Sequence, residues 1–208
     1  MEHKITVVGI GPGSPDYMLP VAQRIITKAR VLVGSKRALD TYSNVNTVSK
    51  IIDKDIDGVL DFIKKQLISN DVVVMVSGDP GFYSMLGALR EKFSSEQLLV
   101  IPGISSAQLA FARLGELWQD AILTSLHGRD QDADTLKYVP RKKLGILTDG
   151  INNPQTIAQK LIALDWPDKT RVWLCENLSY ENETIMSTNL KDTININGFS
   201  HCVMVVTG

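Results

Sequence analysis

The stretch "VVGIGPGSPDY", residues 7–17, places three glycines and a proline directly after a short run of β-branched residues. A glycine-rich turn after a first strand lets the backbone come close to a ligand, and such turns often cradle phosphate groups. The ligand that this turn accommodates, if any, therefore decides which function the sequence predicts.

The turn departs from the known nucleotide-binding patterns. A dinucleotide fingerprint needs Gly-x-Gly-x-x-Gly and an acidic residue about 20 residues further on. Gly9 and Gly11 fit, but the third position is Ser14, and Pro12 has no backbone N–H to offer a phosphate. The second expected strand ends in "GSK", residues 34–36, without an acid, and no Walker sequence is present. A nicotinamide-dependent oxidoreductase is thus disfavoured, and a turn without any ligand stays open from this stretch alone.

Composition sets broad limits on partners and compartment. The chain has 208 residues and a net charge of −1, so no strong electrostatic field attracts nucleic acid or an anionic membrane. The first residues lack the features of a signal peptide, and no apolar run approaches about 20 residues. Cys175 and Cys202 each lie in an apolar run and form no Cys-x-x-Cys pair. We expect a cytoplasmic protein with buried free thiols and with neither nucleic acid nor membrane as partner.

Strand and helix patterns alternate in the first half of the chain. Expected strands cover residues 5–10, 30–34, 71–79 and 97–103, and helical apolar spacing covers residues 19–29, 57–68, 82–93 and 105–115. This series predicts a mainly parallel sheet with helices on both faces.

The rhythm changes at "GELWQD", residues 115–120, where we expect the domain boundary. Later strands have fewer helices between them, which favours a mixed sheet. We therefore predict two α/β domains, residues 1–115 and 116–208, with a ligand-binding cleft between them.

Two further turns support a binding site in the first domain. "VSGDPGFYS", residues 76–84, and "VIPGISSAQ", residues 100–108, also follow expected strands. Ligands of open α/β sheets bind outside the carboxyl ends of the strands, so the three turns are expected to converge. The Asp79 carboxylate suits ribose hydroxyls or an ammonium group better than phosphates. The alternative for Asp79 is a helix N-cap.

Together and in this order, Gly-x-Gly-Pro-Gly, Ser-Gly-Asp-Pro and Ile-Pro-Gly-Ile-Ser-Ser resemble the motifs of the tetrapyrrole (corrin/porphyrin) methylases. The resemblance implies two α/β domains and a cleft for the methyl donor S-adenosylmethionine, without a Rossmann methyltransferase fold. This cofactor has no phosphate, so a proline in the first turn is tolerated. The resemblance also implies a homodimer.

Three later stretches are similar to one branch of the family. "SLHGRD", "LTDGINNPQTIA" and "CENLSYENE" look most like the enzymes that methylate C5 of the corrinoid cobalt-precorrin-7 in cobalamin biosynthesis. Fused relatives carry a second methyltransferase, which acts at C15 and decarboxylates. We expect that activity to reside here in a separate protein. Family members acting on ribosomal RNA or on a modified elongation factor remain alternatives, as does a non-catalytic binding module.

The resemblance also implies site residues. Cofactor contacts are expected from Pro12, Gly78, Asp79, Phe82, Ser105 and Ser106, and more loosely from Leu147, Asp149, Leu178 and His201. For His201, a strand-start histidine bonded to the backbone is the alternative. No catalytic base and no metal ligand is identified, and Asp149 is only a guess for a base.

A corrinoid substrate carries many carboxylates, so cations should bind it. "SLHGRD" offers His127 and Arg129, of which Arg129 is preferred, and "GSKR" offers Lys36 and Arg37. For each of these residues, a solvated surface position is the alternative.

Overall fold

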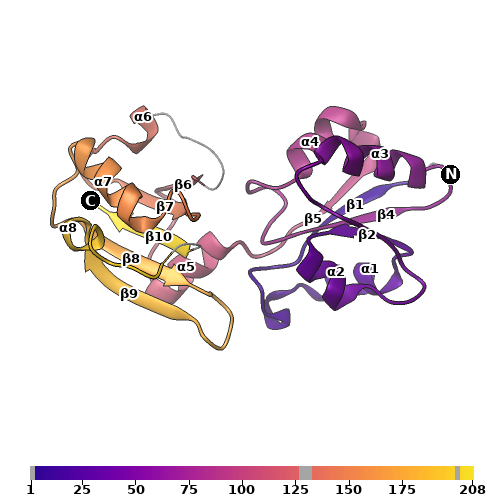
Figure 1. Cartoon of the computed structure of the whole chain (residues 1–208), viewed down its shortest axis with the longest axis horizontal. Coiled ribbons are helices and arrows are strands. Elements are labelled where there is room, and N and C mark those ends of the chain that lie inside the picture. The colour runs from indigo at the N-terminus through magenta and orange to yellow at the C-terminus, as the bar shows by residue number, and fades with distance from the viewer. Residues whose placement is uncertain (1–2, 127–132, 200–201) are drawn as a thin grey trace. The chain divides into compact units, whose positions relative to one another are not determined.

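The computed structural model describes residues 3–126, 133–199 and 202–208 and divides into two compact units, Met1–Ser105 and Ser106–Gly208. Each unit has its own five-stranded sheet (Figure 1). The units are described separately below.

The first unit is an open α/β sheet in which every described strand pair is parallel, as expected. The strand order is β3-β2-β4-β1-β5. The strands are β1 (Ile5–Gly9), β2 (Val31–Gly34), β3 (Val48–Ile51), β4 (Val72–Val76) and β5 (Leu98–Ile101). The helices are α1 (Pro20–Lys28), α2 (Lys36–Tyr42), α3 (Ile56–Gln66) and α4 (Leu86–Lys92), with 3₁₀ turns at Pro15–Tyr17 and Ser95–Gln97.

Helices cover both faces of this sheet because successive strand residues point to opposite sides. Val7 of β1 packs in the cluster that contains residues of α3 and α4, whereas Val8 packs in the cluster that contains residues of α1 and α2. Local caps set the helix starts: the Ser35 side chain caps α2 and the Asp55 side chain caps α3. The continuous apolar runs of β1 and β4 follow from burial on both faces.

The second unit is built on a mixed sheet, also as expected, with strand order β6-β7-β10-β8-β9. Strand β6 runs parallel to β7, whereas β10 is antiparallel to β7 and β8, and β9 is antiparallel to β8. The strands are β6 (Ala121–Ser125), β7 (Lys143–Leu147), β8 (Arg171–Glu176), β9 (Thr184–Asn189) and β10 (Cys202–Thr207). The helices are α5 (Ser106–Leu114), α6 (Ala133–Leu136), α7 (Pro154–Ala163) and α8 (Leu190–Thr193).

Helix α5 belongs to the second unit, so the division falls after Ser105 and not near residue 115 as the sequence pattern suggested. The physical reason is packing: α5 contacts β7 and β10. A Cβ atom added to Gly145 of β7 would lie 2.8 Å from Cε2 of Phe111 in α5, so the strand needs a glycine where the helix crosses it.

Two elements of the first unit were not expected, and one begins later than expected. Strand β3 lies at the sheet edge with mostly exposed residues, so it lacks the apolar pattern of a buried strand. Helix α2 holds Lys36 and Arg37 in its first turn. Helix α4 begins at Leu86 because residues 80–85 form turns after β4.

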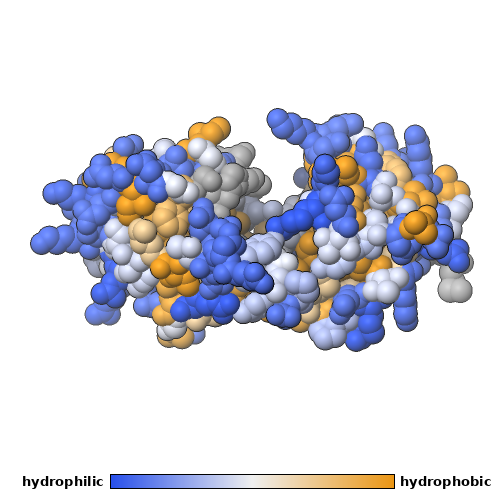
Figure 2. Space-filling model, turned by 60° about the horizontal axis from the view of Figure 1, so that its bottom comes forward, coloured by the Kyte–Doolittle hydropathy of each residue, from blue (hydrophilic) through white to orange (hydrophobic). Residues whose placement is uncertain are grey.

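Hydrophilic residues predominate on the face of the molecule shown in Figure 2, and hydrophobic residues appear there in small groups. Across the described residues, none of the helices has the length and apolar character needed to cross a membrane.

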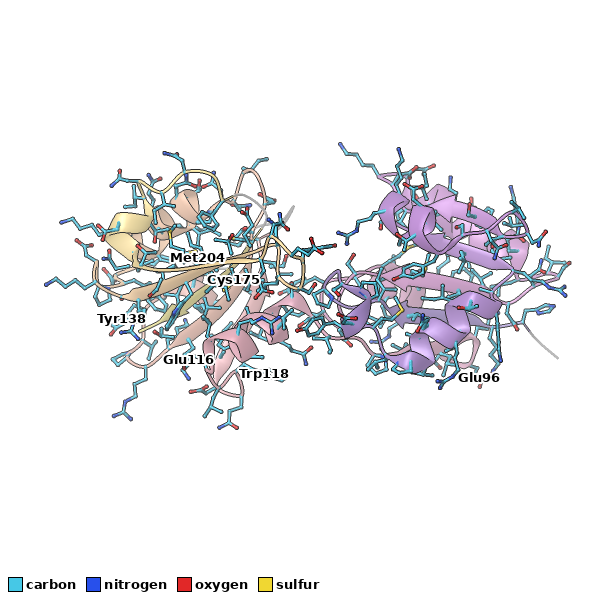
Figure 3. All side chains as sticks on the ribbon, turned by 90° about the horizontal axis from the view of Figure 1, so that it is seen from below. Glu96, Glu116, Trp118, Tyr138, Cys175 and Met204 are labelled. Atoms are coloured by element: carbon cyan, nitrogen blue, oxygen red, sulfur yellow. The ribbon has the colours of Figure 1, made fainter. Side chains whose placement is uncertain are left out.

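Both cysteines are buried and free, as expected. Cys175 lies in β8 near Met204 of the adjacent β10 (Figure 3), and Cys202 begins β10. Burial raises the pKa of the Cys175 thiol to about 12 and that of Cys202 to about 11. The thiolate, which is the reactive form, is therefore scarce at neutral pH.

We predict slow modification of both thiols by a water-soluble disulfide reagent at pH 8 in the folded protein, because the thiols are buried and protonated. The measurement is the rate of thiol release, with the unfolded chain in denaturant as the control. Modification of the folded protein at the rate of the unfolded chain would contradict this burial.

Candidate functional site

The turns after β4, β1 and β5, three neighbouring strands, touch backbone to backbone. The Gly78 N–H donates to the Gly11 carbonyl at 2.8 Å, and the Gly11 N–H donates to the Gly78 carbonyl at 3.3 Å. A Cβ atom on Gly9 would lie 2.6 Å from the Gly78 oxygen and 2.7 Å from the Gly103 nitrogen. The glycines are therefore required by this close approach, and the three turns converge as predicted.

Asp79 connects two of these turns. Its Oδ1 accepts a hydrogen bond from the Gly81 N–H at 2.7 Å, and its Oδ2 accepts one from the Gly103 N–H at 3.0 Å. Helix α4 begins at Leu86 with Met85 at the N-cap, so the alternative of Asp79 as a helix cap is wrong. The carboxylate instead ties the turn after β4 to the turn after β5 by charge-assisted hydrogen bonds.

These contacts use the glycine amides that a phosphate would need. The N–H groups of Gly11, Gly78, Gly81 and Gly103 all donate to acceptors within the turns. Pro12 offers no N–H at all. Phosphate-binding loops work by directing such amides at the ligand, so this edge suits a ligand without phosphates.

The convergence lies at a topological switch point of the sheet. Strand β1 leads to α1 on one face, and the adjacent β4 leads to α4 on the opposite face. Ligands of open α/β sheets bind at such points, outside the carboxyl ends of the strands.

The other sequence-predicted residues of this unit follow the same strand ends. Pro12 is half-buried in the first turn, and Ser105 is buried at the end of the third. Phe82 stacks edge-to-face on Tyr83, with ring centroids 4.9 Å apart. Ser106 is the first residue of α5 and so belongs to the second unit.

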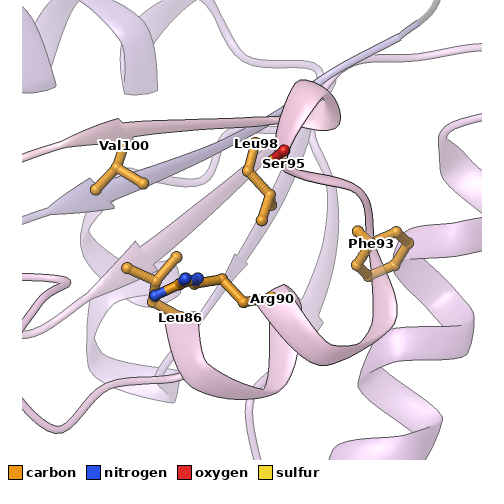
Figure 4. Close-up of a pocket in the computed structure, with 6 residues that line it drawn as sticks. All are labelled: Leu86, Arg90, Phe93, Ser95, Leu98 and Val100. Carbon is orange, nitrogen blue, oxygen red and sulfur yellow. The ribbon is translucent and has the colours of Figure 1, made fainter.

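A separate groove lies between α4 and β5, and neither the turn glycines nor Asp79 line it. It is lined by Leu86, Arg90, Phe93, Ser95, Leu98 and Val100 (Figure 4). We assign it no part in the candidate site.

In the second unit, the predicted residues also gather at one sheet edge. Leu147 ends β7 and pairs with Val203, and Leu178 follows the end of β8, where Glu176 pairs with Cys202. The carboxyl ends of β7 and β8 therefore lie beside the start of β10. His127, Arg129 and His201 lie outside the described residues.

Asp149 is buried and organises the turn after β7. Its Oδ1 accepts hydrogen bonds from the N–H groups of Ile151 at 2.8 Å and Asn152 at 2.6 Å. Its observed contacts are thus those of a turn-forming aspartate.

Thr148 lies within the stretch 147–149 that the family resemblance indicated, but the contacts that it makes were not predicted. Its Oγ1 accepts from the Cys202 N–H at 2.9 Å and donates to the Cys202 carbonyl at 3.0 Å, which ties the end of β7 to the start of β10. The Asn152 side chain similarly donates to the Leu126 carbonyl at 2.8 Å. The sequence signal that could have identified Thr148 and Asn152 is their position as polar residues shortly after the buried strand β7.

The turn that carries Leu178 has an unusual backbone. Asn177 and Ser179, on either side of the buried Leu178, have φ angles of 51° and 75°. Glu183 accepts a hydrogen bond from the Ser179 N–H and is paired with Arg113 of α5. Sequence reasoning missed this pair as well.

The electrostatics of Glu183 follow from these contacts. The Arg113 hydrogen bond lowers the pKa of the Glu183 carboxyl, burial opposes the shift, and the Ser179 N–H adds to it. The resulting stabilisation is fully present above the ordinary glutamate pKa and is lost as the pH falls through the lowered value.

Comparison with known proteins identifies the family of this chain. A profile described as "Tetrapyrrole (Corrin/Porphyrin) Methylases" matches residues 4–194. The chain belongs to this family.

Similar proteins within the family match nearly the whole chain. A probable cobalt-precorrin-7 C(5)-methyltransferase from Methanocaldococcus jannaschii is 35% identical over 97% of this chain and 96% of its own length. A cobalt-precorrin-7 C(5)-methyltransferase from Salmonella typhimurium is 35% identical over 87% of this chain and 88% of its own length. The crystal structure of a precorrin-6Y methylase from Archaeoglobus fulgidus aligns with a TM-score of 0.75 and 27% identity, covering 99% of this chain and 97% of that one.

We predict that Asp79→Asn lowers the free energy of unfolding by about 1.5–3 kcal/mol, because the new amide can replace only one of the two acceptors. Denaturant unfolding followed by circular dichroism measures the loss. Asp61→Asn, at an exposed position of α3, is the matched control and should unfold like the unaltered protein. Equal stability of the Asp79 variant would show that the carboxylate does not hold the turns together.

Proposed function

We propose that this tetrapyrrole methylase transfers a methyl group from S-adenosylmethionine to C5 of cobalt-precorrin-7, a step of cobalamin biosynthesis. The observation that carries the proposal is the set of three converging turns with internally bonded glycine amides. Two relatives with 35% identity over most of both chains carry the name of this activity.

The turn residues fit the proposed cofactor. Backbone surfaces formed by glycines allow a phosphate-free ligand to approach closely, whereas a pyrophosphate would find the amides of Gly11, Gly78 and Gly103 already bonded. We propose that Pro12, Gly78, Asp79, Phe82, Ser105 and Ser106 contact the cofactor, and that Leu147, Asp149, Leu178 and His201 also contribute.

The chemistry requires little from the protein beyond positioning. When bound, S-adenosylmethionine supplies a methyl group already activated by the sulfonium, so no covalent nucleophile is needed. The protein would hold the corrinoid carbon in line with that methyl group in a site that excludes water. Asp79 and the glycine turns would fix the cofactor side of this arrangement.

The substrate side calls for cations. Arg129, together with His127 two residues earlier in the sequence, is proposed to bind carboxylates of the corrinoid through charge-assisted hydrogen bonds. The two relatives above are named for the C5 position alone, and this chain covers nearly all of their length. We therefore also propose that C15 methylation and decarboxylation belong to a separate protein, and that this enzyme acts as a homodimer.

The proposed function predicts binding of S-adenosylhomocysteine but not of NAD in calorimetry, and addition of one methyl group to cobalt-precorrin-7 at C5. Mass spectrometry and NMR of the product locate the methyl group. Binding of NAD alone would contradict the cofactor. A methyl group on another carbon would contradict the branch, although the protein would still be a tetrapyrrole methylase.

Arg129→Ala should raise KM for the corrinoid roughly tenfold or more, since a charge-assisted hydrogen bond is worth about 1.5–3 kcal/mol. Its affinity for S-adenosylhomocysteine should stay unchanged, because only the substrate is polyanionic. Arg24→Ala, at an exposed position of α1, serves as the control. A variant that binds the cofactor poorly and the substrate normally would show that the role is misassigned.

A further inference from the structure

We infer that Arg113 and Glu183 are positioning residues for cofactor binding, acting through the turn that carries Leu178. This inference rests on the proposed function, in which Leu178 contacts S-adenosylmethionine. It adds Arg113 on helix α5 and Glu183, the last residue of the stretch "CENLSYENE" just before β9, neither of which was assigned a role from the sequence.

The pair has a two-point geometry. Arg113 Nε donates to Glu183 Oε1 at 2.6 Å, and Arg113 Nη2 donates to Glu183 Oε2 at 3.3 Å. A guanidinium and a carboxylate joined at two points fix each other's orientation as well as their distance. The Glu183 side chain is 19% exposed and that of Arg113 is 35% exposed, so water screens the pair only in part.

Glu183 passes this restraint on to the backbone. Its Oε2 also accepts the Ser179 N–H at 2.7 Å, so one carboxylate joins helix α5 to the turn after β8. Two backbone bonds continue the turn, from the Tyr180 N–H to the Asn177 carbonyl and from the Glu183 N–H to the Tyr180 carbonyl. Figure 1 shows α5 beside the connection between β8 and β9.

The turn needs such a restraint because its conformation is unfavourable by itself. Left-handed φ angles are uncommon for residues other than glycine, and here Asn177 and Ser179 both adopt them. Such conformations persist where surrounding contacts over-determine them, and they cluster at ligand sites. Releasing Ser179 should let the turn relax and move Leu178 away from the place where it meets the cofactor.

The test compares two single variants with a matched control. In Arg113→Met and Glu183→Gln, the affinity for S-adenosylhomocysteine measured by calorimetry should fall about tenfold, corresponding to about 1.4 kcal/mol. The control is Glu116→Gln, which also removes a glutamate paired with a cation of the second unit. Its partner Lys143, 3.5 Å away, is the first residue of β7, at the opposite end from Leu147. The control should bind S-adenosylhomocysteine as the unaltered protein does, whatever its melting temperature.

A charge-swapped variant separates positioning from simple ion pairing. Arg113→Glu combined with Glu183→Arg can form an ion pair again, but it places a donor where the Ser179 N–H needs an acceptor. We expect the melting temperature to recover toward that of the unaltered protein while the affinity for S-adenosylhomocysteine stays low. Recovery of the affinity would overturn the role of the Ser179 contact.

The outcomes distinguish this inference from the function on which it rests. If the unaltered protein binds S-adenosylhomocysteine and the folded single variants bind it equally well, only the positioning role is overturned. If the unaltered protein does not bind S-adenosylhomocysteine, the proposed function fails and the positioning role fails with it. Circular dichroism establishes that each variant is folded before its affinity is compared.

Discussion

The first unit depends on the close approach of three backbone turns, held by one carboxylate. Gly9 and Gly103 lie so near the Gly78 carbonyl that a side chain on either would overlap it. Asp79 then bonds the amides of Gly81 and Gly103, which fixes the turn after β4 against the turn after β5. Because these glycine N–H groups already donate to acceptors within the turns, they are not available to bind a phosphate. The edge therefore suits a ligand that is recognised by its shape and by other polar groups.

The second unit organises its sheet edge by different means. Side chains, and not glycine contacts, join the strand ends there: Thr148 bonds the backbone of Cys202, Asn152 bonds Leu126, and Asp149 closes its own turn. In this mixed sheet, β10 starts at the edge where β7 and β8 end. Each of these side chains forms a hydrogen bond with a backbone N–H or carbonyl group that has no partner in the strand pairing of the sheet.

Much of the architecture could be predicted because its signals are local. Buried parallel strands such as β4 are continuous apolar runs, and the helix start at α7 follows from Asn153 and Pro154 at its cap. The weaker predictions concerned elements whose signals are not local. Strand β3 is an exposed edge strand, and α5 follows the first domain's pattern in sequence but packs on the second sheet. Asp79 could be recognised as important, but its partner Gly103 is distant in the sequence.

By itself, the sequence determined the two α/β halves, the parallel and mixed character of their sheets, and the glycine and proline turns at the strand ends. These properties follow from the hydrophobic period and from the backbone freedom of single residues. Only the tertiary structure decided that Gly11 and Gly78 exchange backbone hydrogen bonds, that Asp79 joins two turns, and that Arg113 reaches Glu183 across 70 residues of chain. Hydrogen bonds between distant segments depend on which strands become neighbours, and that order is set by packing of the whole unit.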